Sequence, residues 1–166
     1  LGWSIALRYP APFSLGRLGS SFLGGVTAGF VLANNLRALA VGTVLGVFSF
    51  GVLSVAPLLV TLGAVSYVSV QFAQSGYDPL TFILAIPTPH GVLEIPAAFL
   101  WCALAVRLGA TFVVPPQGMT VGEAWLQALA DFLKVALALS LPLLVIAAWI
   151  EAHVTPLIAF WVYGGG

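Results

Sequence analysis

The sequence predicts an all-α membrane protein, a polytopic helical bundle of about four spanning helices. Its 166 residues are 61% hydrophobic and only 6% charged, with a mean hydropathy of +1.12, whereas soluble domains carry about 25% charged residues. The apolar runs are long and continuous, without the alternation that is typical of a β-barrel, so the spans are helices. The net charge is zero, with five Lys and Arg residues, which excludes a basic surface for nucleic acid.

The N-terminal 33 residues are expected to differ from the rest of the chain. Residues 18–33 are apolar and rich in glycine, but shorter than the roughly 20 apolar residues that a spanning helix needs. We therefore expect residues 1–33 to form an interfacial or re-entrant lead-in, and residues 34–163 to form a single transmembrane domain.

The first two spans are separated by Pro57. The first is expected to open at the polar patch Asn34-Asn35-Leu36-Arg37 and to run from about 36 to 55. Small residues at Ala38, Gly42 and Gly46 let another helix approach it closely, from this chain or from a second copy. The second span is expected at about 58–74, followed by a turn at 75–79.

A broken element precedes the third span. Residues 80–86 are apolar but far too few to cross a membrane. The break is marked by Pro87, Pro89 and Gly91. We expect Thr88 to cap the next helix, with Pro89 at its first position, where a missing N–H costs nothing. That helix is expected to span from about 89 to 108.

An amphipathic helix is expected around 121–133, before the last span. Thr120 and Glu123 have the spacing of a capping box, and charged residues alternate with apolar ones at helical spacing. We expect this helix to lie in the membrane interface with Trp125 as an anchor. The last span is expected at about 133–153, bent at Pro142, with a short apolar tail after it.

Counting the crossings places polar residues from three segments at one depth. His90 and Glu94 lie four residues apart and share a helix face. The first two spans form a hairpin, which returns the chain to the side of the membrane where it started. The start of the first span, the start of the third span and the end of the last span are therefore expected at the same membrane face. The expected intramembrane cluster comprises Asn34, Asn35, Arg37, His90, Glu94, Glu151 and Thr155.

Three interpretations of this cluster stay open. In the first, Arg37 neutralises Glu94 or Glu151, and the cluster fixes helix packing in a non-enzymatic scaffold or complex subunit. In the second, the acidic residues form a proton or ion site of a channel or transporter built on an oligomer. In the third, His90, Glu94 and Glu151 bind a metal ion for intramembrane hydrolysis, although no His-Glu-x-x-His motif is present.

Three segments together resemble one known family. Residues 89–97, Pro-His-Gly-Val-Leu-Glu-Ile-Pro-Ala, resemble the proline-His-Gly-x-x-Glu-x-x-Ala signature of proteins similar to stage II sporulation protein M. Asn34-Asn35-x-Arg37 is similar to the paired asparagines of that family, and residues 150–156, Ile-Glu-Ala-His-Val-Thr-Pro, are similar to its closing motif. Thr61-Leu62-Gly63 departs from the family, which often has Asn-Gly in this helix.

The resemblance implies an integral, multi-pass protein of the cell (plasma) membrane of bacteria or archaea. The sporulation member of the family acts in a membrane complex with cell-wall-degrading partners, as a scaffold without chemistry of its own. We therefore expect the lipid bilayer and either a second copy, preferably as a dimer, or other membrane proteins as partners. No cofactor and no metal are expected. Cys102 is the single cysteine, which excludes a thiolate metal site, and residues 19–29 lack the Gly-Lys-Ser/Thr end of a phosphate loop.

Overall fold

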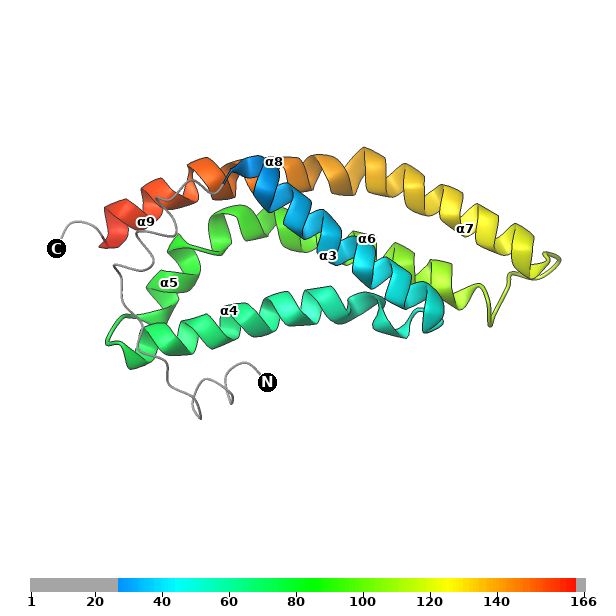
Figure 1. Cartoon of the computed structure of the whole chain (residues 1–166), viewed down its shortest axis with the longest axis horizontal. Coiled ribbons are helices and arrows are strands. Elements are labelled where there is room, and N and C mark those ends of the chain that lie inside the picture. Colours follow the sequence, from blue (N-terminus) through cyan, green and yellow to red (C-terminus); the bar gives the residue numbers. More distant parts are fainter. Residues whose placement is uncertain (1–26, 164–166) are drawn as a thin grey trace.

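A computed structural model describes residues 27–163 of the chain, and within them every regular element is helical. Figure 1 shows an elongated bundle of long helices. Four helical segments of this part are long and apolar enough to cross a membrane, which confirms the predicted fold class. They are Ala28–Phe48, Val52–Gln74, Thr88–Ala110 and Val121–Tyr163.

The first helix, α3 (Ala28–Phe48), begins earlier than expected. Thr27 caps it, accepting a hydrogen bond of 3.2 Å from the backbone N–H of Phe30 on its Oγ1. The polar patch at Asn34 therefore lies in the second turn of the helix and does not open it, since a better N-cap stands upstream. The expected lead-in is helical from Ala28 on, and its residues 1–26 lie outside the described part of the chain.

The small residues of α3 pack within the chain. The helix ends at a turn where Gly51 has φ +98, and η1 (Val52–Val55) and α4 (Ala56–Gln74) return along it. A Cβ on Gly42 would lie 2.5 Å from Pro57 Cγ, and one on Gly46 would lie 2.8 Å from Ser54 Cβ. The small residues of α3 therefore allow η1 and α4 of the same chain to pack closely against it.

The broken element before the third span is confirmed. Helix α5 (Pro79–Ala85) is capped by Asp78, and α6 (Thr88–Ala110) follows after two residues. Thr88 does not act as the expected cap, because it already lies in the helix, and its hydroxyl donates to the carbonyl of Ile83 at 2.6 Å. This hydrogen bond ties the start of α6 to α5 across the break.

The last 43 residues of the described chain form one long helical segment, from α7 (Val121–Val135) through η2 (Ala136–Ser140) and α8 (Leu141–His153) to α9 (Thr155–Tyr163). The amphipathic α7 and its capping box at Thr120 are as predicted. Its buried residues, Ala124, Ala128 and Phe132, lie on the side that faces α6. Its expected place in the membrane interface stays a prediction.

Two features of this segment differ from expectation. The residues before Pro142 form a π-helix, η2, where we expected a bend. Proline lacks an N–H, and its ring crowds the carbonyl four residues earlier, and a wider turn relieves that crowding. The expected tail is helix α9, which contacts α5. Its Ile158 and Val162 belong to an apolar cluster that contains Phe72 of α4 and Phe82 of α5.

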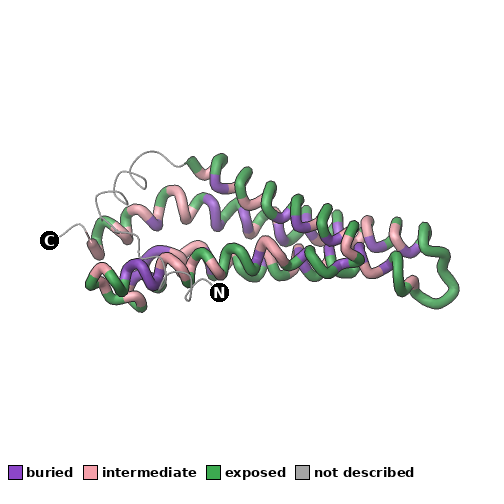
Figure 2. The backbone as a smooth tube through the Cα atoms, turned by 60° about the horizontal axis from the view of Figure 1, so that its bottom comes forward, coloured by how far each residue is buried: buried purple, intermediate pink, exposed green. Residues whose placement is uncertain are grey.

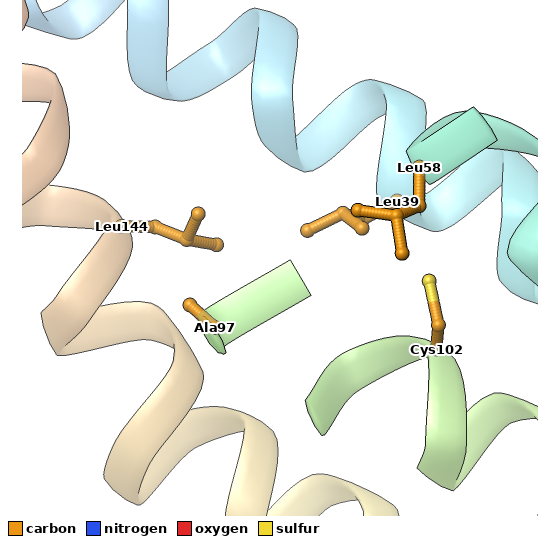
Figure 3. Close-up of a cluster of buried hydrophobic side chains, with 5 residues drawn as sticks. All are labelled: Leu39, Leu58, Ala97, Cys102 and Leu144. Atoms are coloured by element: carbon orange, nitrogen blue, oxygen red, sulfur yellow. The ribbon is translucent and has the colours of Figure 1, made fainter. Parts of the chain in front are cut away.

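One cluster of buried apolar side chains lies where α3, α4, α6 and α8 meet. Figure 3 shows its five side chains pointing toward one another: Leu39, Leu58, Ala97, Cys102 and Leu144. Many large apolar side chains face outward along the helices, and Figure 2 shows exposed residues on the outside of every helix. This distribution is expected of helices that contact lipid tails.

A candidate cation or proton site between helices α6 and α8

The structure brings together three ionisable side chains from two helices. One ligand atom each of His90, Glu94 and Glu151 lies within 4.8 Å of the other two. The Nε2 atom of His90 is 3.9 Å from Glu151 Oε2. We call these three residues the His90–Glu94–Glu151 cluster.

The local sequence explains how the cluster forms. His90 and Glu94 occupy the first two turns of α6, one above the other on the same face. Gly91 between them is buried. Glu151 lies in the last turn of α8, which contacts α6 and runs antiparallel to it. The end of one helix therefore meets the beginning of the other.

Thr155, at the first position of α9, holds the ring of His90. Its side chain is fully buried, and its Oγ1 lies 3.3 Å from His90 Nδ1. This contact occupies one of the two ring nitrogens of His90. The other nitrogen, Nε2, faces Glu151. Partners of this kind fix the orientation and tautomer of histidines that bind protons or metals.

A small cleft adjoins Glu94 on the side of α3. It has a volume of about 30 Å³, and Asn35 of α3 and Glu94 both line it. The Nδ2 atom of Asn35 is buried and has no hydrogen-bond partner within residues 27–163. A cleft of this size holds a water molecule. The cleft thus connects α3 to the cluster through polar groups.

Arg37 and Asn34 do not reach the cluster. Both side chains are exposed, and the ion pairs of the described residues join His90 to Glu151 and Arg107 to Asp131, without Arg37. The expected neutralisation of Glu94 or Glu151 by Arg37 is therefore absent. The reason is helical geometry, because Arg37 lies two residues from Asn35 and so points to the opposite side of α3.

The cluster therefore needs a compensating positive charge. No Lys or Arg side chain of residues 27–163 pairs with either of its carboxylates. Two carboxylates at most 4.8 Å apart repel each other by about 3.5 kcal/mol at an effective dielectric constant of about 20. A proton shared within the cluster or a bound cation can remove this repulsion.

Two interhelical contacts were not predicted from the sequence. Arg107 of α6 donates to Asp131 of α7, with Nη1 2.9 Å from Oδ2. Trp101 of α6 donates its indole N–H to Thr43 Oγ1 of α3 at 2.9 Å. The first pair does not follow from distance along the chain, because Arg107 lies three residues before the end of α6 and Asp131 lies ten residues after the start of α7. The second depends on the register between α3 and α6, for which the sequence carries no signal.

These features define a helical membrane protein in which ionisable residues gather between helices. The chain belongs to the stage II sporulation protein M family, whose family model matches residues 7–156. An uncharacterized protein of Methanocaldococcus jannaschii is similar to it, with 28% identity over 139 residues that cover 78% of this chain and 71% of the relative. No solved structure matches the chain.

Proposed function

We propose that the chain is a multi-pass, non-enzymatic scaffold or subunit of a complex in the cell membrane. The family to which it belongs supports this function. The observation that carries it is the small size of the cleft beside Glu94. A cleft of about 30 Å³ is much smaller than the roughly 300–1,000 Å³ of small-molecule sites. In this proposal, the His90–Glu94–Glu151 cluster joins α6, α8 and α9 at the place where their ends meet.

A proton- or ion-linked channel or transporter, formed by several copies, is the second candidate. One observation favours it: two carboxylates lie close to a histidine between apolar helices, without a Lys or Arg partner in residues 27–163. Ionisable residues in this situation often mark ion or proton pathways. A path through the membrane would then have to lie between chains.

The first experiment compares the mass of the assembly with that of the chain. The tagged chain, produced at its natural level in its own cells, is released from the membrane and measured by native mass spectrometry. The scaffold proposal predicts a fixed complex with a different protein, heavier than the 17.3 kDa chain. A mass equal to the chain alone, or to multiples of it, would contradict the scaffold proposal.

The second experiment measures proton and cation flux into liposomes that contain the purified chain. The scaffold proposal predicts no flux above that of protein-free liposomes. The transport proposal predicts a flux that Glu94→Gln abolishes while the variant stays folded. Glu123→Gln is the matched control, because Glu123 is exposed and serves the capping box of α7.

A further inference from the structure

We propose that His90, Glu94 and Glu151 bind one first-row divalent metal cation per chain. The inference concerns the same cluster as the proposed function but does not depend on it, because metal binding is measured on the purified chain and assembly is measured in membranes. The whole sequence has two His and five Asp and Glu residues, and three of these seven converge here.

The ligand set fits such a cation. One imidazole nitrogen and two carboxylate oxygens are ligands that Zn²⁺ accepts in proteins. In a tetrahedral Zn²⁺ site, ligand atoms are about 3.4 Å apart, whereas the three atoms here lie within 4.8 Å. Both glutamates are only half-buried. Rotations of their side chains can close the difference without a shift of the helices.

The charge of the site also fits. A divalent cation, two carboxylates and one neutral imidazole sum to zero, which is the least costly state for a group buried among apolar helices. An imidazolium alone would leave one negative charge. The exposed Arg37 contributes nothing, since its side chain takes part in no ion pair with residues 27–163.

A second observation, independent of the acids, concerns the histidine. Thr155, which is fully buried, contacts His90 Nδ1 at 3.3 Å, so that Nε2 is directed at Glu151. Metal-binding histidines characteristically have their other ring nitrogen held in this way. When Nδ1–H donates to Thr155, the lone pair of Nε2 faces Glu151, and a cation between them makes this arrangement favourable.

We expect a water molecule at the fourth coordination position, and the cleft that Glu94 lines lies beside the cluster. This cleft has room for a water molecule, and Asn35 lines it with an amide nitrogen that lacks a partner in the described chain. A metal-bound water in this cleft would accept a hydrogen bond from that amide. The site would then have three protein ligands and one exchangeable position.

The test uses the full chain in detergent after dialysis against a chelator. We titrate with Zn²⁺, measure the bound metal by elemental analysis and follow the melting temperature. The expected result is one Zn²⁺ per chain and a melting temperature that rises with the Zn²⁺ concentration. Binding of less than one equivalent, or no rise, would overturn the proposal.

Variants localise the binding. Glu94→Gln, Glu151→Gln and His90→Asn should each remove tight binding, and Thr155→Val should weaken it roughly 10- to 100-fold, as loss of an outer-shell partner does. Glu123→Gln and His153→Asn are matched controls and should bind like the unmodified chain, because both residues are exposed and lie outside the cluster. Equal binding by all variants, or a loss with His153→Asn alone, would overturn the proposal.

A spectroscopic measurement on the unmodified chain covers the case in which the variants fail to fold. Co²⁺ in place of Zn²⁺ should give the intense visible absorption of four-coordinate nitrogen and oxygen ligation, and an excess of Zn²⁺ should abolish it. The weak spectrum of hexa-aquo Co²⁺ would overturn the proposal.

Discussion

Two pairs of residues, each four positions apart, build the candidate site. His90 and Glu94 share a face of α6, and Glu151 and Thr155 share the facing side of α8 and α9. Each pair contributes one acid and one hydrogen-bonding partner, and the contacts cross from one helix to the other. The site is therefore a property of two helix ends that face each other.

Among the glycines that the structure describes, Gly109 of α6 has the least space for a Cβ atom. A Cβ at Gly109 would collide with the backbone N of Gly51 and the carbonyl O of Gly46. We expect Gly109→Ala to lower the free energy of unfolding in detergent by about 1–3 kcal/mol, because backbone atoms cannot rotate away. Gly63→Ala is the control, since nothing lies within 4 Å of a Cβ there. Equal stability of the two variants would contradict the close packing of α3 on α6.

Asp78 links stability to pH at the head of α5. Its carboxylate accepts hydrogen bonds from the backbone N–H and the hydroxyl of Thr81, at 2.7 and 2.6 Å, and these bonds hold the pKa of Asp78 below its usual value. The cap is thus fully present above the unfolded pKa of about 3.9 and is lost as the pH falls through the lower folded pKa.

We therefore expect Asp78→Ala to lower the melting temperature at neutral pH. The difference from the unmodified chain should shrink as the pH falls below about 4. Melting curves of both proteins in detergent across this range measure the effect. A difference that stays constant with pH would show that the Asp78 charge has no part in capping α5.

Much of the site could be predicted from single residues. The four-residue spacing of His90 and Glu94 and the count of membrane crossings predicted that both residues lie near Glu151. The structure shows this proximity. Arg37 was assigned to the same group because the count of crossings placed the whole polar patch of residues 34–37 at the same membrane face. Residues two apart point to different sides of a helix, and no pattern in the sequence showed which side of α3 faces α6.

At the scale of helices, α3 and α6 are held in register by a polar contact. Trp101 donates to Thr43 Oγ1 at 2.9 Å, and the Thr43 hydroxyl donates to the carbonyl of Leu39 in its own helix. The sequence showed that both helices exist and roughly where they end, because long apolar runs are reliable signals. It did not show this register, or the earlier start of α3, which depends on the weak signal of a single cap at Thr27.

Removal of this interhelical hydrogen bond should have a modest cost. We expect Thr43→Val to lower the unfolding free energy by about 0.6–1.7 kcal/mol, the range found for such bonds in membrane proteins. Thr61→Val is the control, because the Thr61 hydroxyl donates only to the Pro57 carbonyl of its own helix. Reversible unfolding in mixed micelles measures both. A larger loss for Thr61→Val would show that the contact with Trp101 does not matter.

The whole molecule is longer than the membrane it is expected to cross. Its last helical segment has 43 residues, about 65 Å at 1.5 Å per residue, against a hydrocarbon core of about 30 Å. Arg107 and Asp131 mark one end of the apolar region, and Asp78, Tyr77 and Tyr163 mark the other. Part of the excess length belongs to α7, which carries charged residues and lies at one end of the bundle in Figure 1.

Labelling of single cysteines tests this placement. The natural Cys102 is buried and should not react. Gln74→Cys, at the end of α4, and Gln127→Cys, in α7, should react with a membrane-impermeant maleimide from opposite sides of the membrane. Val145→Cys, which is exposed in the middle of the last segment, should not react because lipid covers it. Labelling of Gln74→Cys and Gln127→Cys from the same side would contradict the topology.

The π-helix η2 has a consequence for the comparison of relatives. Along a continuous α-helix, Phe132 and Ser140 would lie about 80° apart, yet both are buried. The five residues of η2 fill roughly the angular space of four α-helical residues, so the segment carries one residue more than a plain helix would need. A homologue that lacks this residue can keep the acid of α8 opposite the imidazole of α6. We therefore expect one-residue gaps in alignments of the family to fall between Ala136 and Ser140.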